Sequence, residues 1–173
     1  MNILKKLIFI LIIFFPLNQA FAETPYYIDF KFILNQSEAG KKAQKELKNK
    51  LTNGIDSLSK REKGLQEDEK RIIEQKKIIS EQEYIKNVTN LRTKVSKLQK
   101  DRNQLLENIS KQRTKAREEL LKNLNPILKE YMLDKKIRMI IDKKNLILAD
   151  ENLNITKDII KLLNSKIKTI KLN

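Results

Sequence analysis

The sequence predicts an α+β fold, mostly α, in which a long antiparallel helical hairpin projects from a small β body. Two observations lead to this prediction. Between Ala39 and Pro126 the chain has no proline, and apolar residues recur on both sides of Ser80 at spacings of seven, or of three and four. Such spacings are typical of a narrow seam between two helices. The β-containing body is assigned to residues 23–38 and 118–173, where short apolar runs indicate strands.

Residues 1–22 have the features of a secretory signal peptide. Two lysines precede an apolar run from residue 7 to residue 17, and Ala20 and Ala22 supply the small residues that a cleavage site needs. The run is shorter than the roughly 20 apolar residues of a membrane-spanning helix, which disfavours an uncleaved anchor. We therefore expect cleavage after residue 22 and export of the mature chain.

The helical hairpin is expected over residues 39–117, with its tip near residue 80. Ser80 followed by Glu83 is a capping-box pattern, in which the serine hydroxyl accepts a backbone N–H and the glutamate reaches back. A second helix should therefore begin here. The seam residues before the tip are Leu51, Leu58, Leu65, Ile72 and Ile79, and those after it are Val88, Leu91, Val95, Leu98, Leu105 and Ile109.

The first arm of this hairpin is expected to be weak. Charged residues such as Lys48 and Glu62 lie at seam positions, where a stable coiled coil would have apolar residues. Gly54 and Gly64 each cost roughly 0.5–1 kcal/mol relative to alanine. We therefore expect an arm that bends easily.

Positive charge is concentrated in the second arm. The whole chain has 37 Lys and Arg against 22 Asp and Glu, and residues 84–117 have ten Lys or Arg against Asp101 and Glu107. Such a rod is either a solvated helix face or a surface that attracts acidic partners over long range, and both readings remain open. The candidate partner-attracting residues are Lys86, Arg92, Lys94, Lys97, Lys100, Arg102, Lys111 and Arg113.

The body is expected to contain three short strands. Residues 26–32 alternate between apolar and polar, and residues 137–141 and 146–149 predict a β-hairpin. Pro126 is expected to kink the helix that enters the body, and Thr156 to cap the last helix. So small a body has too little core to be stable alone, and its strand edges invite pairing with another chain. Oligomerisation through the body is the expected remedy.

Composition disfavours catalysis. The chain has no histidine and no cysteine, which removes the usual general base, the usual zinc ligands and the commonest nucleophile partners. Paired acidic residues lie in strongly charged helical surroundings and are better explained as solvated faces. We therefore expect no enzyme, no cofactor and no metal site.

Two stretches of the chain resemble the Skp/OmpH family of periplasmic chaperones. Residues 27–47, YIDFKFILNQSEAGKKAQKEL, are similar to the opening strand and first helix start of that family. Residues 125–166, NPILKEYMLDKKIRMIIDKKNLILADENLNITKDIIKLLNSK, are similar to its closing hairpin, loop and last helix. SEQEYIKNVTNL, residues 80–91, lies where the family has its tip. In one departure, Lys136-Ile137 stands where the family commonly has Gly-Tyr, so the helix end there is in question.

The resemblance implies a homotrimer whose helical tentacles project from a body completed by trimerisation. Its function would be that of an ATP-independent holdase in the periplasm of a Gram-negative-type bacterium, which holds unfolded outer-membrane proteins in a cavity between the tentacles. Acidic lipid headgroups are a further candidate partner. The residues expected in the trimer body are Tyr27, Ile28, Phe30, Met139, Ile141, Leu146 and Leu148.

Two other functions were weighed against this one. A structural coiled-coil adaptor or spacer of the cell envelope has the same periodicity, so the resemblance is what favours the chaperone. A nucleic-acid binder would explain the charge, but the export signal opposes it, as does the scarcity of aromatic residues along the basic arm.

Overall fold

The structure is a computed structural model, and it describes residues 24–172. The expected signal peptide, with Ala20 and Ala22, lies outside the described residues. Among the residues described, no helix is both long enough and apolar enough to cross a bilayer. The elements in chain order are β1 (Tyr26–Ile28), α2 (Phe30–Gln36), α3 (Glu38–Gln75), α4 (Glu81–Lys135), β2 (Ile140–Asp142), the 3-10 turns η1 (Lys143–Asn145) and η2 (Glu151–Leu153), and α5 (Thr156–Lys166).

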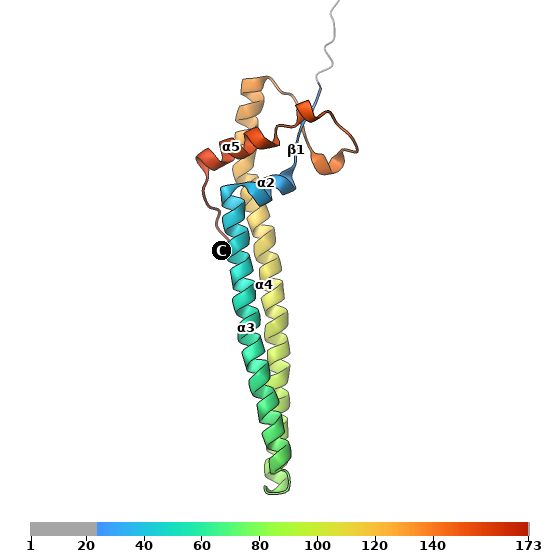
Figure 1. Ribbon diagram of the computed structural model, residues 1–173, viewed down its shortest axis with the longest axis vertical. Helices are drawn as coiled ribbons and strands as arrows, with labels where there is room; N and C mark the ends of the chain where they lie inside the picture. Colours follow the sequence, from blue (N-terminus) through green and yellow to red (C-terminus); the bar gives the residue numbers. More distant parts are fainter. Residues whose placement is uncertain (1–23, 173) are drawn as a thin grey trace, which may run out of the picture.

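Helices α3 and α4 form one long antiparallel hairpin, with the other elements gathered at one end (Figure 1). Helix α4 has 55 residues, which at 1.5 Å per residue makes it about 80 Å long. At the tip, Ser80 is the N-cap residue of α4, and its Oγ accepts the Glu83 N–H at 3.3 Å. The mostly α, α+β fold class predicted from the sequence is confirmed.

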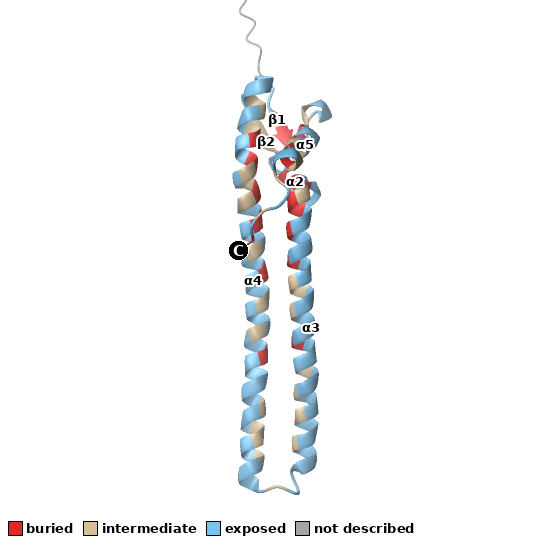
Figure 2. Cartoon of the chain, turned by 90° about the vertical axis from the view of Figure 1, so that its left-hand side faces the viewer, coloured by how far each residue is buried: buried red, intermediate tan, exposed pale blue. Residues whose placement is uncertain are grey.

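The core of the body lies where α2, α5 and the root of α4 meet. Leucine and isoleucine side chains from these three helices are fully buried there, because each helix has an apolar stripe that it can bury against the other two. Figure 2 shows most of the buried residues at this end of the molecule. The fully buried apolar residues are Ile33, Leu120, Leu124, Ile159 and Leu163.

The prediction of a strand over residues 26–32 is wrong in its second half. Strand β1 ends at Ile28, and Asp29 then caps α2, since its Oδ1 accepts the Phe32 N–H at 2.8 Å. Phe30 and Ile33 face the core with helical spacing, while Phe32 is exposed. The alternation of apolar and polar residues from 29 to 32 is equally compatible with the first turn of a helix, and the side-chain cap at Asp29 stabilises the helix.

The predicted hairpin of residues 137–141 and 146–149 is also absent from the described chain. Strand β2 covers Ile140–Asp142 and pairs in parallel with β1, with Tyr26 opposite Ile140. Residues 146–149 form no strand, and Ile147 and Leu148 are fully or almost fully exposed. Asp142 Oδ1 accepts the Lys144 N–H and starts a 3-10 turn in place of a hairpin turn.

Thr156 has a different role from the predicted cap. The N-cap position of α5 is Ile155, and no side chain caps it. The Thr156 hydroxyl instead accepts the Asp29 N–H at 2.9 Å and donates to Asn154 Oδ1 at 2.6 Å. This joins the start of α5 to the junction between β1 and α2. Pro126 lies inside α4, and the helix continues beyond it.

Helix α4 ends at a left-handed residue even though that residue is a lysine. Lys136 has φ 55° and ψ 33°, and it is the only residue other than glycine with positive φ among residues 24–172. The Ile137 N–H donates to the Met132 carbonyl at 2.8 Å, which satisfies a carbonyl in the last turn of the helix. The chain therefore makes the same kind of stop that glycine makes at less steric cost.

Candidate binding surfaces of the arms and the strand edge

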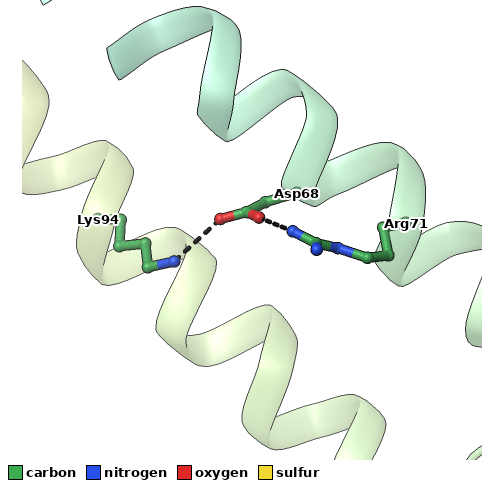
Figure 3. A network of polar contacts seen from close by, with 3 residues as sticks. All are labelled: Asp68, Arg71 and Lys94. Carbon is green, nitrogen blue, oxygen red and sulfur yellow. Dashed lines mark hydrogen bonds and ion pairs between the residues drawn. The ribbon is translucent and has the colours of Figure 1, made fainter.

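Ion pairs across the hairpin engage part of the predicted basic arm. Asp68 of α3 lies between Lys94 of α4 and Arg71 of its own helix, and its Oδ2 is 2.9 Å from the Lys94 Nζ (Figure 3). The hydrogen bond from Lys94 is the main cause that lowers the pKa of the Asp68 carboxyl. This carboxylate therefore stays ionised and joins the two arms.

Two further cross-arm pairs lie closer to the body. Arg102 Nη2 is 3.1 Å from Glu62 Oε2, and Arg61 Nη1 is 2.7 Å from Asp101 Oδ2. The acidic partners on α3 could not be identified from the sequence, because identifying them requires the register between the two helices. The sequence does give one indication of these partners, because Glu62 and Asp68 lie in the first arm, which was expected to be weak on account of its charged residues.

Five of the eight predicted basic residues have no acidic partner within the described part of the chain. Lys94 and Arg102 pair with α3, and Lys111 pairs with Glu107 one turn away in α4, which lowers the pKa of Glu107. The remaining five are exposed and have no acidic partner among residues 24–172: Lys86, Arg92, Lys97, Lys100 and Arg113. Whether they attract a partner stays a prediction.

Apolar side chains are exposed along the same arms. No residue from 59 to 97 is fully buried, so the distal half of the hairpin has a seam but no core. Single apolar side chains of both helices and of the turn between them are exposed among the lysines and arginines; one of them, Val95, was predicted in the seam but is half exposed. The arms thus offer many small apolar contacts in a basic setting. These side chains are Ile55, Ile73, Ile85, Val95 and Leu106 on the helices and Ile78 in the turn at the tip, each at least half exposed.

Gly54 has a packing role that the sequence analysis did not predict. A Cβ at this position would lie 2.6 Å from Leu105 Cδ2, so the glycine makes room for the Leu105 side chain of the facing helix. Gly64 is different, because a Cβ there would meet nothing within 4 Å. The two glycines were expected to act alike, but the first allows the helices to pack closely and the second does not.

The residues expected in the trimer body fall into two groups. Tyr27, Ile28 and Phe30 are buried in the described chain, and the Phe30 ring lies 5.4 Å from the Arg117 guanidinium carbon. Burial of Tyr27 and the nearby carboxylate of Glu151 raise the pKa of its hydroxyl. The second group is half-buried or exposed and lies on β2 or in the segments directly before and after it: Met139, Ile141, Leu146 and Leu148.

Strand β2 has a free edge beside an apolar groove. Strand β1 lies between β2 on one side and a single bridge from Tyr27 to Asn154 on the other. The opposite edge of β2 has no strand partner among the described residues. A groove between β2 and the root of α4 is lined mainly by apolar side chains, among them Leu121, Leu128, Met132, Met139 and Ile141.

The fold and the surfaces together define a class of protein. A helical hairpin with exposed apolar and basic side chains projects from a small body of helices and two short strands, and one strand edge of this body is free. The comparisons with known proteins give the family. The model of the family described as "Outer membrane protein (OmpH-like)" matches residues 26–163, and the chain belongs to this family. No curated protein is significantly similar in sequence.

A solved structure has the same fold. It is a crystal structure from Caulobacter crescentus CB15, described as that of a candidate outer membrane chaperone (OmpH-like). The match has a TM-score of 0.79 at 19% sequence identity, and it covers 86% of this chain and 89% of that one. At this identity the likeness concerns the fold.

Proposed function

We propose that this protein is an ATP-independent holdase chaperone of the periplasm, and that it binds unfolded outer-membrane proteins in a cavity between the arms of a homotrimer. Membership of the OmpH-like family supports this proposal, as does the fold shared with a protein described as a candidate outer membrane chaperone. The signal-peptide pattern predicted for residues 1–22 is consistent with the periplasmic location that it includes.

The observation that carries the proposal is the composition of the distal arms. From residue 59 to residue 97 the helices and the turn between them bury no side chain fully, yet they expose Ile73, Ile78, Ile85 and Val95 among lysines and arginines. An unfolded client would touch many of these side chains at once, and several weak contacts to one client add up to useful affinity without a deep pocket. The partnerless cations Lys97 and Lys100 would speed the capture of acidic clients and would also attract acidic lipid headgroups.

The free edge of β2 supports assembly into an oligomer. A strand edge with unpaired N–H and C=O groups is stabilised by pairing with another chain. Leu146 and Leu148 follow β2 in the chain, the first half-buried and the second almost fully exposed, and both would become buried in such an assembly. Three copies joined in this way would place three hairpins around one cavity.

The test is the mass of the mature protein by light scattering, first alone and then after dilution of a urea-denatured outer-membrane β-barrel into it. We expect a trimer that keeps the client soluble in a defined complex at physiological salt without ATP. A monomer or dimer that lets the client aggregate would contradict the proposal and favour an envelope spacer. As matched variants that each remove one charge, Lys97→Gln should slow capture, whereas Lys94→Gln, whose charge already pairs with Asp68, should slow it less.

A further inference from the structure

The C-terminal tail, residues 167–172, lies against the root of the arms. It leaves α5 in an extended conformation, with φ −138° and ψ 120° at Ile167. The end of the chain then lies beside the hairpin, just below the body (Figure 1). The family match ends at residue 163, before this tail begins. The tail is therefore a feature of this chain that the family match does not include.

The tail is seated by apolar contacts. Leu172 is 4% exposed and packs with Ala43 and Leu47 of α3 and Ala116 of α4, each of which is equally buried. Ile170 packs against this cluster and also against the core of the body. These contacts lie where the two arms emerge from the body, so the tail covers the seam between them.

Polar contacts at the end of α5 and at the start of the tail set the path of the tail. Asn164 Oδ1 accepts the N–H of Glu38 at 2.8 Å, and Lys168 Nζ is 3.0 Å from Glu38 Oε1. Both contacts hold the first turn of α3. They orient the tail along the arms, but they do not bury its backbone, because Lys168 and Thr169 are exposed.

The pattern of the tail shows what kind of segment this surface accepts. Ile170 and Leu172 face the protein, while Lys171 between them faces solvent. Alternation of apolar and polar side chains in an extended segment is the pattern of a β-strand with one buried face. The root also has apolar surface that the tail leaves open, a groove lined by Leu34, Leu47, Leu51 and Ala116, among others.

We propose that the root of the arms is a binding site for extended, alternately apolar segments of an unfolded chain, and that the tail occupies this site as an intramolecular competitor. This inference rests on the proposed function, whose client it takes as the partner. A tethered segment acts at a high effective concentration, so a client segment must be strongly apolar to displace it. The tail thus prevents weakly apolar chains from binding at the root.

The test compares the full mature chain with a chain that ends at Lys166 and with Leu172→Ser, using a urea-denatured outer-membrane β-barrel as the probe. The apparent Kd equals the intrinsic Kd divided by the fraction of molecules with the site free. We therefore expect both variants to bind the client at least about threefold more tightly. Lys171→Arg, which keeps the charge of an exposed residue of the same tail, is the matched control and should leave the Kd unchanged.

The direction of the change in Kd distinguishes a tail that competes with the client from a tail that only stabilises the arms. Truncation removes Lys168 and Lys171, and this loss of positive charge would by itself weaken the binding of an acidic client. A tail that merely braces the arms would also give equal or weaker binding when removed. Equal or weaker binding by both variants, with the helical circular dichroism unchanged, would overturn the inference.

Two measurements make the test independent of misfolding and of the client. Nile red should fluoresce more strongly with the truncated chain, and amide exchange around Ala43 and Leu47 should become faster, because the apolar root is uncovered.

Since the chain has no cysteine, Leu47→Cys with Leu172→Cys can lock the tail by a disulfide. The locked form should bind the client more weakly than its reduced form, and equal binding would contradict the inference. If the proposed function itself fails, none of the chains binds the client, and the Nile red and exchange results still report whether the tail covers the root.

Discussion

Near the body, α3 and α4 are held together by buried apolar side chains, whereas towards the tip they are held by ion pairs. Ala43, Leu47 and Ala116 are almost fully buried at the root. Beyond Leu58 and Leu98 no residue of either arm is fully buried, and contacts such as Lys94 with Asp68 take over. The same two helices therefore have a core at one end and a solvated seam at the other.

This difference shows how one element can be anchored and adaptable at once. Burial of apolar area is the main stabilising term in proteins, while ion pairs between exposed side chains contribute little and are screened by salt. The root should therefore resist opening, and the distal arms should bend and separate easily. The proposed function, in which the arms enclose clients of different sizes, would need this combination.

The largest expected effect comes from removing core volume at the root. Leu120→Ala leaves a cavity at a position that is fully buried, and we expect a loss of about 2–5 kcal/mol in the free energy of unfolding. Leu106→Ala, on the same helix but 54% exposed, should change it by less than about 0.5 kcal/mol. Urea unfolding followed by circular dichroism, at one protein concentration, measures both. Equal losses would show that the outer faces of the arms are packed in solution.

The glycines of α3 give the next largest contrast, with opposite signs. A Cβ at Gly40 would lie 1.9 Å from the backbone oxygen of Leu34, so Gly40→Ala should destabilise the protein by about 1–3 kcal/mol. Gly64→Ala meets no neighbour within 4 Å, and it should stabilise by roughly 0.5–1 kcal/mol because alanine favours the helix. The same urea titrations apply. A stabilising Gly40→Ala would mean that α2 and α3 do not approach each other as closely as described.

A smaller effect is expected at the end of α4, inside the body and away from both arms. Lys136 has φ 55°, which costs a residue with a side chain more than glycine, so Lys136→Gly should stabilise by about 0.5–1 kcal/mol. Lys135→Gly, one residue earlier and still helical, loses the same charge and should destabilise by a similar amount. Thermal unfolding of the pair measures the difference. If both changes destabilise, the left-handed stop is not retained in solution.

The smallest effect is expected from the distal ion pair. The pKa of Asp68 is lowered in the folded chain, so its contribution is present above the unfolded pKa and is lost as the pH falls through the folded value. We expect amide exchange around Asp68 and Lys94 to become faster below about pH 4, after correction for intrinsic rates, and faster in high salt. Asp68→Asn should show fast exchange at neutral pH and little further change on acidification. No change at the root under the same conditions is the internal control, and parallel changes at both ends would show that the arms open as one unit.

Local sequence signals were sufficient for the long elements and insufficient where two signals competed. The period-seven seam and the Ser80 pattern correspond to α3, α4 and the cap between them. Residues 30–32 fit both a strand and a helix turn, and the hydrogen bond from Phe32 to the Asp29 side chain decided for the helix. Residues 146–149 have strand composition, but no neighbouring strand in the described chain pairs with them.

The candidate surfaces could be located only in part. Sequence alone identified the basic residues of the second arm, but it did not indicate that Lys94 and Arg102 have acidic partners on the first. Gly54 and Gly64 looked equivalent, because the difference between them is the Leu105 side chain, about fifty positions away. The tail gave no signal beyond two apolar residues separated by a lysine.

By itself, the sequence determined the helical hairpin, the position of its tip, the basic second arm and the family resemblance. These depend on periodicity, caps and composition, which act between residues that are neighbours along the chain. The tertiary structure decided the parallel pairing of β1 with β2, the ion pairs between the arms and the seating of Leu172 on the root. Each of these joins residues far apart in the chain, so it depends on how the folded helices lie against each other.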